Sequence, residues 1–373
     1  MRLTEREAKS EFAAAGIKVP RSLPAKNAEQ AAAAVDEIGL PCVIKAQVLS
    51  GGRGKAGLVR VVKNREEALA EAARILSHPV GVPEILVEEC VGFAHELYLG
   101  ISYDPVSSRA LVLASSEGGM DIEELAVRSP EKIARVYVDI TTGLEARHAR
   151  SLVYAMGLEP EFQKTVSAVP SSLWSVFKAC DAELAEINPL FLLADGSAVA
   201  GDGKLAIDDN SAFRHPKYPL ESRPYDSDTA REAALEGIPY LQFDGDISLM
   251  CAGAGLTTTV YDLVADAGGS VANYLEFGGP NYRKGVRAME LCLANNPKVV
   301  LIVTFGTIAR ADVMAQGIAE AIGKLNPTCP IVACIRGTGE EEAWKILKGL
   351  GIEPLSDTEV AVHTAVRLSG GMR

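Results

Sequence analysis

The chain has 373 residues, of which 48% are hydrophobic and 23% charged, with a formal net charge of −12 and a pI near 5.1. This length exceeds an average domain, so two domains are expected. The balance is that of an ordinary globular protein, and no block of Lys and Arg indicates a nucleic-acid surface. The longest apolar runs, such as Val299–Phe305, have the length of a strand and are too short to cross a bilayer.

Targeting and redox features favour a cytoplasmic protein. The first twenty residues are charged throughout and lack the apolar stretch of a signal peptide. The seven cysteines are scattered without a C-x-x-C pair, which is typical of reduced, buried thiols rather than of disulfides or a zinc site.

The first 100 residues alternate between helix and strand patterns. Thr4 and Glu7 have the spacing of a capping box and predict a helix that stops at Gly16. Asn27 begins a second, Ala-rich helix that ends at Gly39. The following elements are predicted as strands at 42–45, 58–62, 84–89 and 96–103 and an amphipathic helix at 65–77.

A hairpin and a change of composition mark the middle of the chain. Strands Glu186–Leu193 and Ser197–Gly201 flank Asp195-Gly196, a strong two-residue turn pattern. Prolines and charges then replace the periodic pattern, which predicts a linker at 223–243. The first domain would therefore span 1–222, with a smaller lid subdomain at about 21–95.

The C-terminal part, 244–373, repeats strand then helix, which implies right-handed βαβ units and a doubly wound parallel sheet. The predicted strands lie near 247–252, 271–277, 298–305 and 330–335, and the predicted helices near 256–267, 283–295, 310–324 and 339–349.

The loop Gly51–Gly57, GGRGKAG, has the composition of a phosphate-binding flap. Its glycines let the backbone approach a phosphate, and Arg53 and Lys55 supply charge. It is not a P-loop, because no Ser or Thr follows the lysine and a strand comes next. Lys45, at the end of the preceding strand, would reach the same phosphates. The alternative is a flexible surface hairpin with solvated cations.

Acidic and amide side chains supply the other candidate ligands. Glu88 and Glu96 could accept hydrogen bonds from an adenine amine or a ribose hydroxyl, or could be solvated. Glu186 and Asn188 face the same side of one strand, and the Asp-Gly turn folds Asp202 back to about the level of Asn188. An amide oxygen and a carboxylate together suit Mg²⁺, which takes its remaining ligands from water and phosphates. The alternative is a polar cross-strand pair.

Several segments in order resemble the ATP-grasp motifs of succinyl-CoA synthetase β subunits: VIKAQVLSGGRGKAG, VEECVGFAHELYLG, SSEGGMDIEE, AEINPLFL and GDGKLAIDDNSAFRH. The resemblance implies an α/β protein with an ATP-grasp fold followed by a flavodoxin-like CoA-ligase domain. It implies Mg²⁺ at Asn188 and Asp202, and assigns Glu186 to face a phosphohistidine. The implied nucleotide-binding residues are Lys45, Gly52, Arg53, Gly54, Glu88, Val91 and Glu96. Val91 stands where the family usually has Thr, which contacts the nucleotide through its backbone.

The reaction implied by the resemblance passes phosphate from ATP to a histidine, then to the acid, and coenzyme A attacks the acyl phosphate. None of the five histidines lies in a Gly-rich, acid-flanked loop; they are His78, His95, His148, His215 and His363. The resemblance therefore implies an α-type, CoA-binding partner subunit that carries the histidine, in an αβ or α₂β₂ enzyme.

The acid pocket of the second domain departs from the succinate pattern. The segment 252–255 is Ala-Gly-Ala-Gly where succinate-specific relatives carry Asn-Gly-Ala-Gly, and 306–309 is Gly-Thr-Ile-Ala where they carry Gly-Gly-Ile-Val. Two helix N-termini would receive the acid's carboxylate. The acid-binding residues implied are Ala252, Thr307, Ile308 and Ala309. Both departures are similar to the citrate-activating relatives, ATP-citrate lyase and citryl-CoA synthetase. Neutral drift would leave succinate as the acid.

Other functions fit parts of the sequence. Gly253-x-Gly255 with Glu276 is similar to a dinucleotide fingerprint, but the third glycine is replaced by Thr258, which argues against NAD. An ATP-grasp ligase acting on an amine, and a non-catalytic assembly subunit, are the remaining alternatives. We expect succinate as the acid, with malate or citrate as alternatives; ATP against GTP and dimer against tetramer stay open.

Overall fold

The computed structural model describes residues 1–49, 51–219, 225 and 227–370, and the chain divides into two compact units, Met1–Leu220 and Glu221–Arg373. The predicted domain boundary at residue 222 lies outside the described residues, as do residues 223, 224 and 226 of the predicted linker. That boundary therefore stays a prediction.

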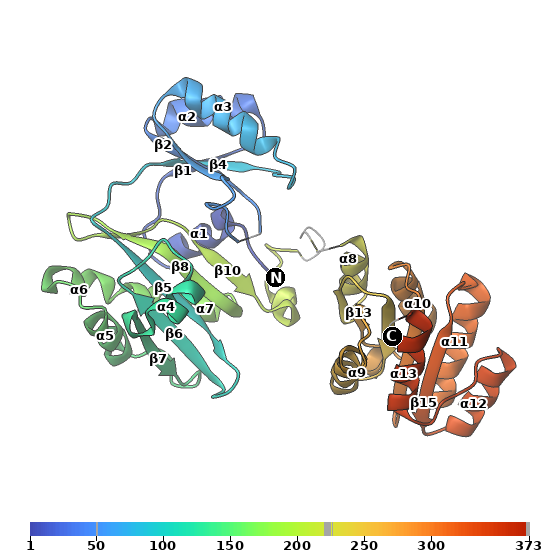
Figure 1. Ribbon diagram of the computed structural model, residues 1–373. Helices are drawn as coiled ribbons and strands as arrows, with labels where there is room; N and C mark the ends of the chain where they lie inside the picture. Colours follow the sequence, from blue (N-terminus) through green and yellow to red (C-terminus); the bar gives the residue numbers. More distant parts are fainter. Residues whose placement is uncertain (50, 220–224, 226, 371–373) are drawn as a thin grey trace. The chain divides into compact units, whose positions relative to one another are not determined.

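The larger part of the N-terminal unit is an antiparallel sheet with helices on one face (Figure 1). Its strand order is β10-β8-β5-β6-β7, and β9 also pairs with β8. Phe12, Leu173 and Phe177 from the helices pack on Leu97 and Ile187 of the sheet, so apolar burial holds this layer together. The strands are β5 His95–Asp104, β6 Arg109–Ser115, β7 Ile133–Val138, β8 Ala182–Leu192, β9 Ala198–Ala200 and β10 Lys204–Ile207. The helices of this part are α1 Glu5–Ala14, α4 Ile122–Arg128, α5 Ala146–Ala155, α6 Pro160–Val166 and α7 Val169–Ala179, with 3₁₀ turns at Pro130–Lys132 and Asp209–Arg214.

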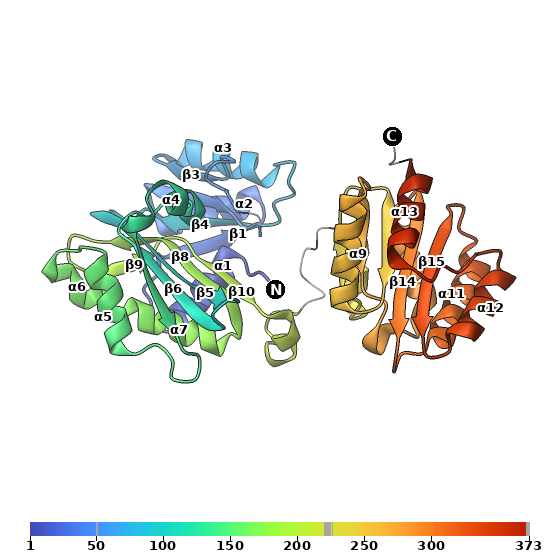
Figure 2. The ribbon, with the colours of Figure 1, turned by 60° about the horizontal axis from the view of Figure 1, so that its bottom comes forward.

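The lid is a second antiparallel sheet, with order β1-β4-β2-β3, covered by α2 and α3 (Figures 1 and 2). Small side chains such as Ala31, Ala68 and Ala72 are fully buried, which lets both helices lie close to the strands. Asn27 caps α2 as predicted, accepting from the Gln30 N–H at 2.9 Å. The lid elements are β1 Ser22–Ala25, α2 Ala28–Ile38, β2 Cys42–Ala46, β3 Val59–Val62, α3 Arg65–Leu76 and β4 Ile85–Glu89.

The C-terminal unit is a doubly wound sheet with order β11-β13-β12-β14-β15, parallel except for β11. Helices α9 and α13 cover one face, and α10, α11 and α12 cover the other (Figure 2). The order β13-β12-β14-β15 is the flavodoxin-like one, so the predicted fold class is confirmed. The elements are α8 Asp228–Leu235, β11 Tyr240–Gln242, β12 Ile247–Cys251, α9 Ala254–Asp266, β13 Val271–Leu275, a 3₁₀ turn at Gly279–Asn281, α10 Gly285–Leu293, β14 Val299–Gly306, α11 Ala311–Leu325, β15 Ile331–Gly337, α12 Glu340–Gly349 and α13 Thr358–Ser369.

The predicted linker is partly wrong. Helix α8 lies within it and buries Ala233 in the C-terminal core, and β11 pairs antiparallel with β13. The sequence did not predict either element. β11 has three residues and α8 buries only Ala233, so neither shows a clear apolar pattern among the surrounding prolines and charges. No helix in the described part of the chain is long and apolar enough to cross a membrane.

Candidate functional site

The glycine flap connects β2 and β3 and bends through tight turns. The Ala56 N–H donates to the Gly52 carbonyl at 3.0 Å, and the Leu58 N–H donates to the Arg53 carbonyl at 2.9 Å. Gly52 has φ +74°, a backbone conformation that L side chains rarely adopt. This backbone conformation directs Arg53 inward, and the Arg53 side chain is 10% exposed.

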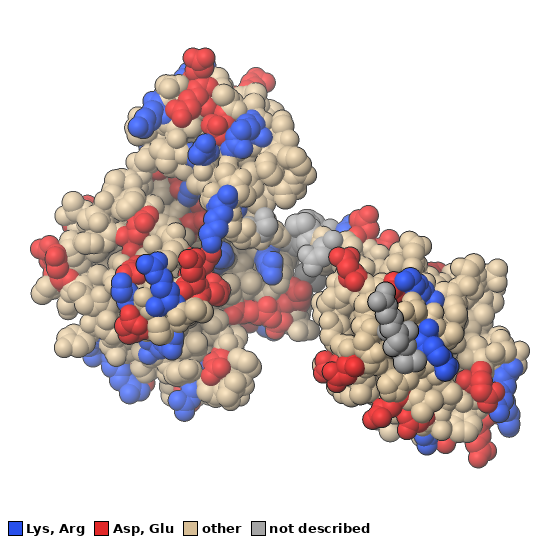
Figure 3. Space-filling view, in the orientation of Figure 1, with Lys and Arg blue, Asp and Glu red and all other residues tan. Residues whose placement is uncertain are grey.

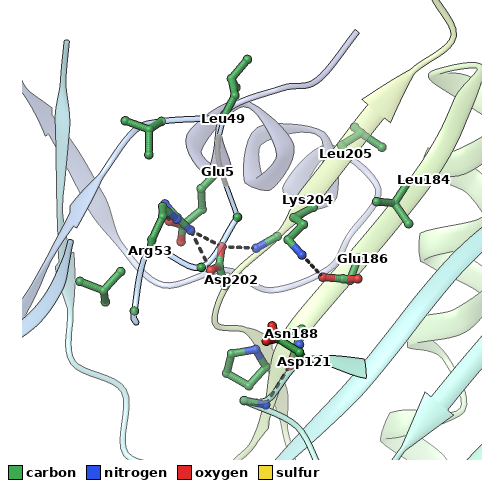
Figure 4. Close-up of a pocket in the computed structure, with 18 of the residues that line it drawn as sticks. Glu5, Leu49, Arg53, Asp121, Leu184, Glu186, Asn188, Asp202, Lys204 and Leu205 are labelled. Carbon is green, nitrogen blue, oxygen red and sulfur yellow. Dashed lines mark hydrogen bonds and ion pairs between the residues drawn. The ribbon is translucent and has the colours of Figure 1, made fainter. Parts of the chain in front are cut away.

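Below the flap lies a cleft of about 820 Å³ between the lid and the large sheet, lined by both (Figure 4). Acidic and basic side chains are interspersed over the face of the molecule shown in Figure 3. The structure brings seven predicted residues to the cleft: Gly52, Arg53, Gly54, Glu96, Glu186, Asn188 and Asp202. Burial raises the pKa of the Glu96 carboxyl group, which lines the cleft.

The predicted metal ligands lie at one level of the sheet. Leu190 pairs with Ala200 on one side and Glu186 with Lys204 on the other, which brackets Asn188 and Asp202. The Asn188 Oδ1 accepts from the Gly119 N–H at 2.8 Å, and its Nδ2 donates to the Met120 carbonyl at 2.8 Å.

Asp202 is engaged by the flap. Its two carboxylate oxygens each accept from Arg53 Nη2 at 2.7 Å, and one also accepts from the Gly203 N–H at 2.7 Å. An amide oxygen and a carboxylate beside a cleft fit a magnesium ion that keeps water and phosphate ligands. No group of three or more His, Cys, Asp or Glu in the described residues forms a metal cage, so phosphates would have to complete the coordination.

Lys45 and Glu88 do not line the cleft but lie buried beside it. Lys45 Nζ is 2.7 Å from Glu88 Oε1 and 2.8 Å from Glu5 Oε1. Burial lowers the pKa of Lys45, but Glu5, Glu88 and Asp202 outweigh it and raise the pKa overall. The predicted phosphate contact of Lys45 therefore stays a prediction, and in this state the ammonium is held by carboxylates.

Sequence reasoning missed Glu5 and Lys9 of α1, which join this buried cluster. Lys9 Nζ lies 2.7 Å from both Glu5 and Glu88. Their i, i+4 spacing was the available pattern, but it is also typical of exposed helix pairs. Their partners are 40 or more residues away in the chain, which hides the site from local patterns.

Glu186 is held by two neighbours that sequence reasoning also missed. It accepts from Tyr98 Oη at 3.1 Å. Lys204 Nζ lies 2.9 Å from Glu186 Oε1 (Figure 4). Burial and then the charge of Glu186 raise the pKa of Tyr98. A Cβ at Gly100 would lie 2.5 Å from Tyr98 Oη, so glycine there makes room for the phenol. Glu186 is thus 8% exposed at the cleft and fixed in direction.

Val91 does not line the cleft, and none of the five histidines, all in described residues, lines it either. The other flap cation, Lys55, pairs with Asp121 at the start of α4 and lies 3.8 Å from Glu124. The flap is therefore held at both cations, Arg53 by buried Glu5 and half-buried Asp202, and Lys55 by exposed acids.

The predicted acid-binding residues lie in the C-terminal unit, after two adjacent parallel strands. Ala252 follows β12 and donates to the Val303 carbonyl at 3.0 Å, while Thr307–Ala309 follow β14. These strands meet at the switch point of the sheet order, where ligands bind in open α/β sheets. Thr307 is exposed, Ile308 is 94% exposed, and α9 and α11 begin just beyond.

Two family models match the chain, an ATP-grasp domain over residues 2–192 and a CoA-ligase domain over 250–368. The ADP-forming sulfoacetate–CoA ligase subunit SauC of Bilophila wadsworthia is 55% identical over the whole of both chains. The chain belongs to the β-subunit family of ADP-forming CoA ligases. It is therefore a subunit of an ADP-forming acid–CoA ligase and carries the family's ATP-binding domain.

Two further relatives and one solved structure are similar to this chain over nine tenths or more of their length. The sulfoacetate–CoA ligase subunit SqwK of an Acholeplasma species is 52% identical over 100% of this chain and 92% of its own. The succinate–CoA ligase β subunit of Ignicoccus hospitalis is 39% identical over 99% of each chain. The structure of ATP citrate lyase from Methanothrix soehngenii has a TM-score of 0.74 at 19% identity, covering 98% of this chain and 100% of its own. That likeness supports the fold alone.

Proposed function

We propose that this β subunit activates sulfoacetate, using Mg-ATP at the cleft of the N-terminal unit and coenzyme A with an α-type partner. The observation that carries the proposal is full-length identity of 55% and 52% to two sulfoacetate–CoA ligase subunits, against 39% for a succinate–CoA ligase subunit. Sulfoacetate was not among the acids expected from the sequence, and succinate is the second candidate.

The pocket departures support this acid. A sulfonate carries three oxygens on a tetrahedral sulfur and is bulkier than a carboxylate. Ala252 in place of the usual Asn opens volume at the end of β12, and Thr307 adds a hydroxyl after β14. A site that pairs each oxygen of its substrate discriminates against a substrate that leaves a donor unpaired.

In this proposal the N-terminal unit transfers the γ-phosphate of ATP to a histidine of the α-type partner. Arg53 and the flap backbone bind the phosphates. Asn188 and Asp202 would hold Mg²⁺, which would supply charge neutralisation at the phosphates. Glu186, fixed by Tyr98 and Lys204, orients the incoming imidazole and stabilises its charged form. Glu96 binds the nucleoside.

The purified complex of this chain with an α-type partner subunit should release ADP when it is supplied with ATP, coenzyme A and sulfoacetate. We expect kcat/KM for sulfoacetate to exceed that for succinate at least about 100-fold, the discrimination that one paired polar group can supply. The Ala252→Asn variant should narrow this ratio by about 10-fold, because its amide fills the space that the sulfonate occupies. A wild-type preference for succinate or citrate would overturn the choice of acid and leave the ligase class untouched.

A further inference from the structure

A buried carboxylate of α1 lies directly beneath the flap, in a place where phosphates would be repelled. Glu5 lines the cleft beside Arg53 (Figure 4), yet its side chain is 1% exposed and contacts three cations. Its Oε1 lies 2.7 Å from Lys9 and 2.8 Å from Lys45, and its Oε2 lies 2.7 Å from Arg53. Thr4 and Glu7 form a capping box at the start of the same helix, which fixes the first turn.

Lys9, one turn further along α1, also pairs with Glu5. Lys9 and Lys45 share the same acceptors, since both ammonium groups contact Glu5, Glu88 and the Gly201 carbonyl, the last at 2.8 and 2.7 Å. Three carboxylates, those of Glu5, Glu88 and Asp202, face three cations. The cluster therefore has no net charge, and each buried charge has a partner of opposite sign that offsets its loss of hydration.

The two ends of Arg53 have different partners. One side of the guanidinium is held by the buried Glu5 and by the Ala46 carbonyl at 2.8 Å, and the other by Asp202, which is 32% exposed at the cleft. An incoming phosphate can replace the exposed partner, because its oxygens can accept the hydrogen bonds that Arg53 Nη2 now donates to Asp202. Glu5, the buried partner, cannot separate from Arg53 without leaving a buried charge unpaired.

We infer that Glu5 is a positioning residue for the nucleotide's phosphates. It holds Arg53 aimed at the cleft while Arg53 exchanges Asp202 for phosphate, and it fixes Lys45 in its buried place beside the cleft. Lys9 neutralises Glu5, so that Lys45 and Arg53 keep positive charge for the ligand. Glu5 touches no substrate atom and acts only through these two cations. The inference rests on ATP binding in this cleft.

The test is the Glu5→Gln variant, which keeps the shape of the side chain and removes its charge. We expect the Kd of the full chain for MgADP, measured by calorimetry, to rise at least about 10-fold. In the complex with the α-type subunit, KM for ATP should rise similarly while KM for coenzyme A stays within about 2-fold. Glu5→Asp, which restores the charge, should recover part of the affinity.

The matched control is Glu11→Gln, on the same helix. Glu11 pairs with Lys217 at 2.7 Å, away from the cleft, so its loss should leave MgADP binding unchanged. The double variant Glu5→Gln/Lys9→Met removes the charges in a pair, and it keeps the test valid where the single variant fails to fold. It too should bind MgADP more weakly.

The opposite sign would overturn the inference. If Glu5 merely competed with phosphate for the cations, Glu5→Gln would bind MgADP more tightly than wild type. An unchanged Kd would also contradict a positioning role. Failure of the wild-type chain to bind MgADP would instead refute the nucleotide cleft itself, whatever Glu5 does.

Discussion

Replacing Asp202 by alanine is expected to reduce phosphorylation of the α-type partner's histidine by ATP at least about 100-fold, to the limit of detection. The variant removes the one carboxylate proposed for Mg²⁺, and Asn188 alone offers a single neutral oxygen. It also releases Arg53 from its exposed partner. Losses of 10²- to 10³-fold are ordinary when a group that stabilises transition-state charge is removed. The measurement is transfer of radiolabelled γ-phosphate to the partner subunit.

Asp195→Ala is the control for that experiment, because Asp195 lies at the turn of the same hairpin region. Its carboxylate accepts from the Ser197 N–H, two residues away, at 2.8 Å, and it does not line the cleft. Phosphorylation should persist in this control. Full phosphorylation by Asp202→Ala would refute the metal assignment.

Replacing Lys45 by methionine is expected to affect both stability and ATP use. Lys45 is buried between Glu5 and Glu88, so its removal leaves these carboxylates short of one cation. Breaking a buried ion pair from one side costs about 3–5 kcal/mol, and chemical denaturation of the chain should show that loss. We also expect kcat/KM for ATP to fall about 100-fold, or about 2.7 kcal/mol of transition-state stabilisation.

Lys63→Met is the matched control in the lid. Lys63 follows β3 and is exposed, so this change should move the free energy of unfolding by no more than about 0.5 kcal/mol. A Lys45→Met variant as stable as this control would show that the buried cluster tolerates an unpaired carboxylate. That result would contradict the argument that the three carboxylates need all three cations.

Local patterns predicted most of the fold because each is decided by neighbouring residues. The capping box at Thr4 and the cap at Asn27 satisfy N–H groups within three residues, and both are present. The alternation of strands and helices after residue 244 predicted the parallel sheet, because βαβ units are almost always right-handed and place successive strands parallel. Helix α13 and strand β11 lay outside this rhythm and were not predicted.

The candidate site was predicted in part, and its misses share one cause. Asn188 and Asp202 could be placed at about one level because the Asp-Gly pattern limits the hairpin register to within about one residue. The predicted two-residue turn is wrong, because Leu192 pairs with Ala198 and the Leu193 N–H donates to the Ser197 carbonyl, which leaves a loop of three residues, 194–196. Glu5, Lys9 and Lys204 were missed because their partners are brought to them by the tertiary fold. Lys45 was expected at the cleft surface. It is buried because α1 places Glu5 and Lys9 beside it, and the sequence around Lys45 does not show this tertiary contact.

The account depends most on the nucleotide's position, and a crystal structure of the chain soaked with MgADP tests it directly. We expect the phosphates beneath residues 51–57, Arg53 turned from Asp202 to a phosphate, and Mg²⁺ about 2.0–2.1 Å from oxygens of Asn188 and Asp202. Nucleotide bound elsewhere, with Asn188 still bonded to Gly119 and Met120 and Asp202 still paired with Arg53, would contradict it.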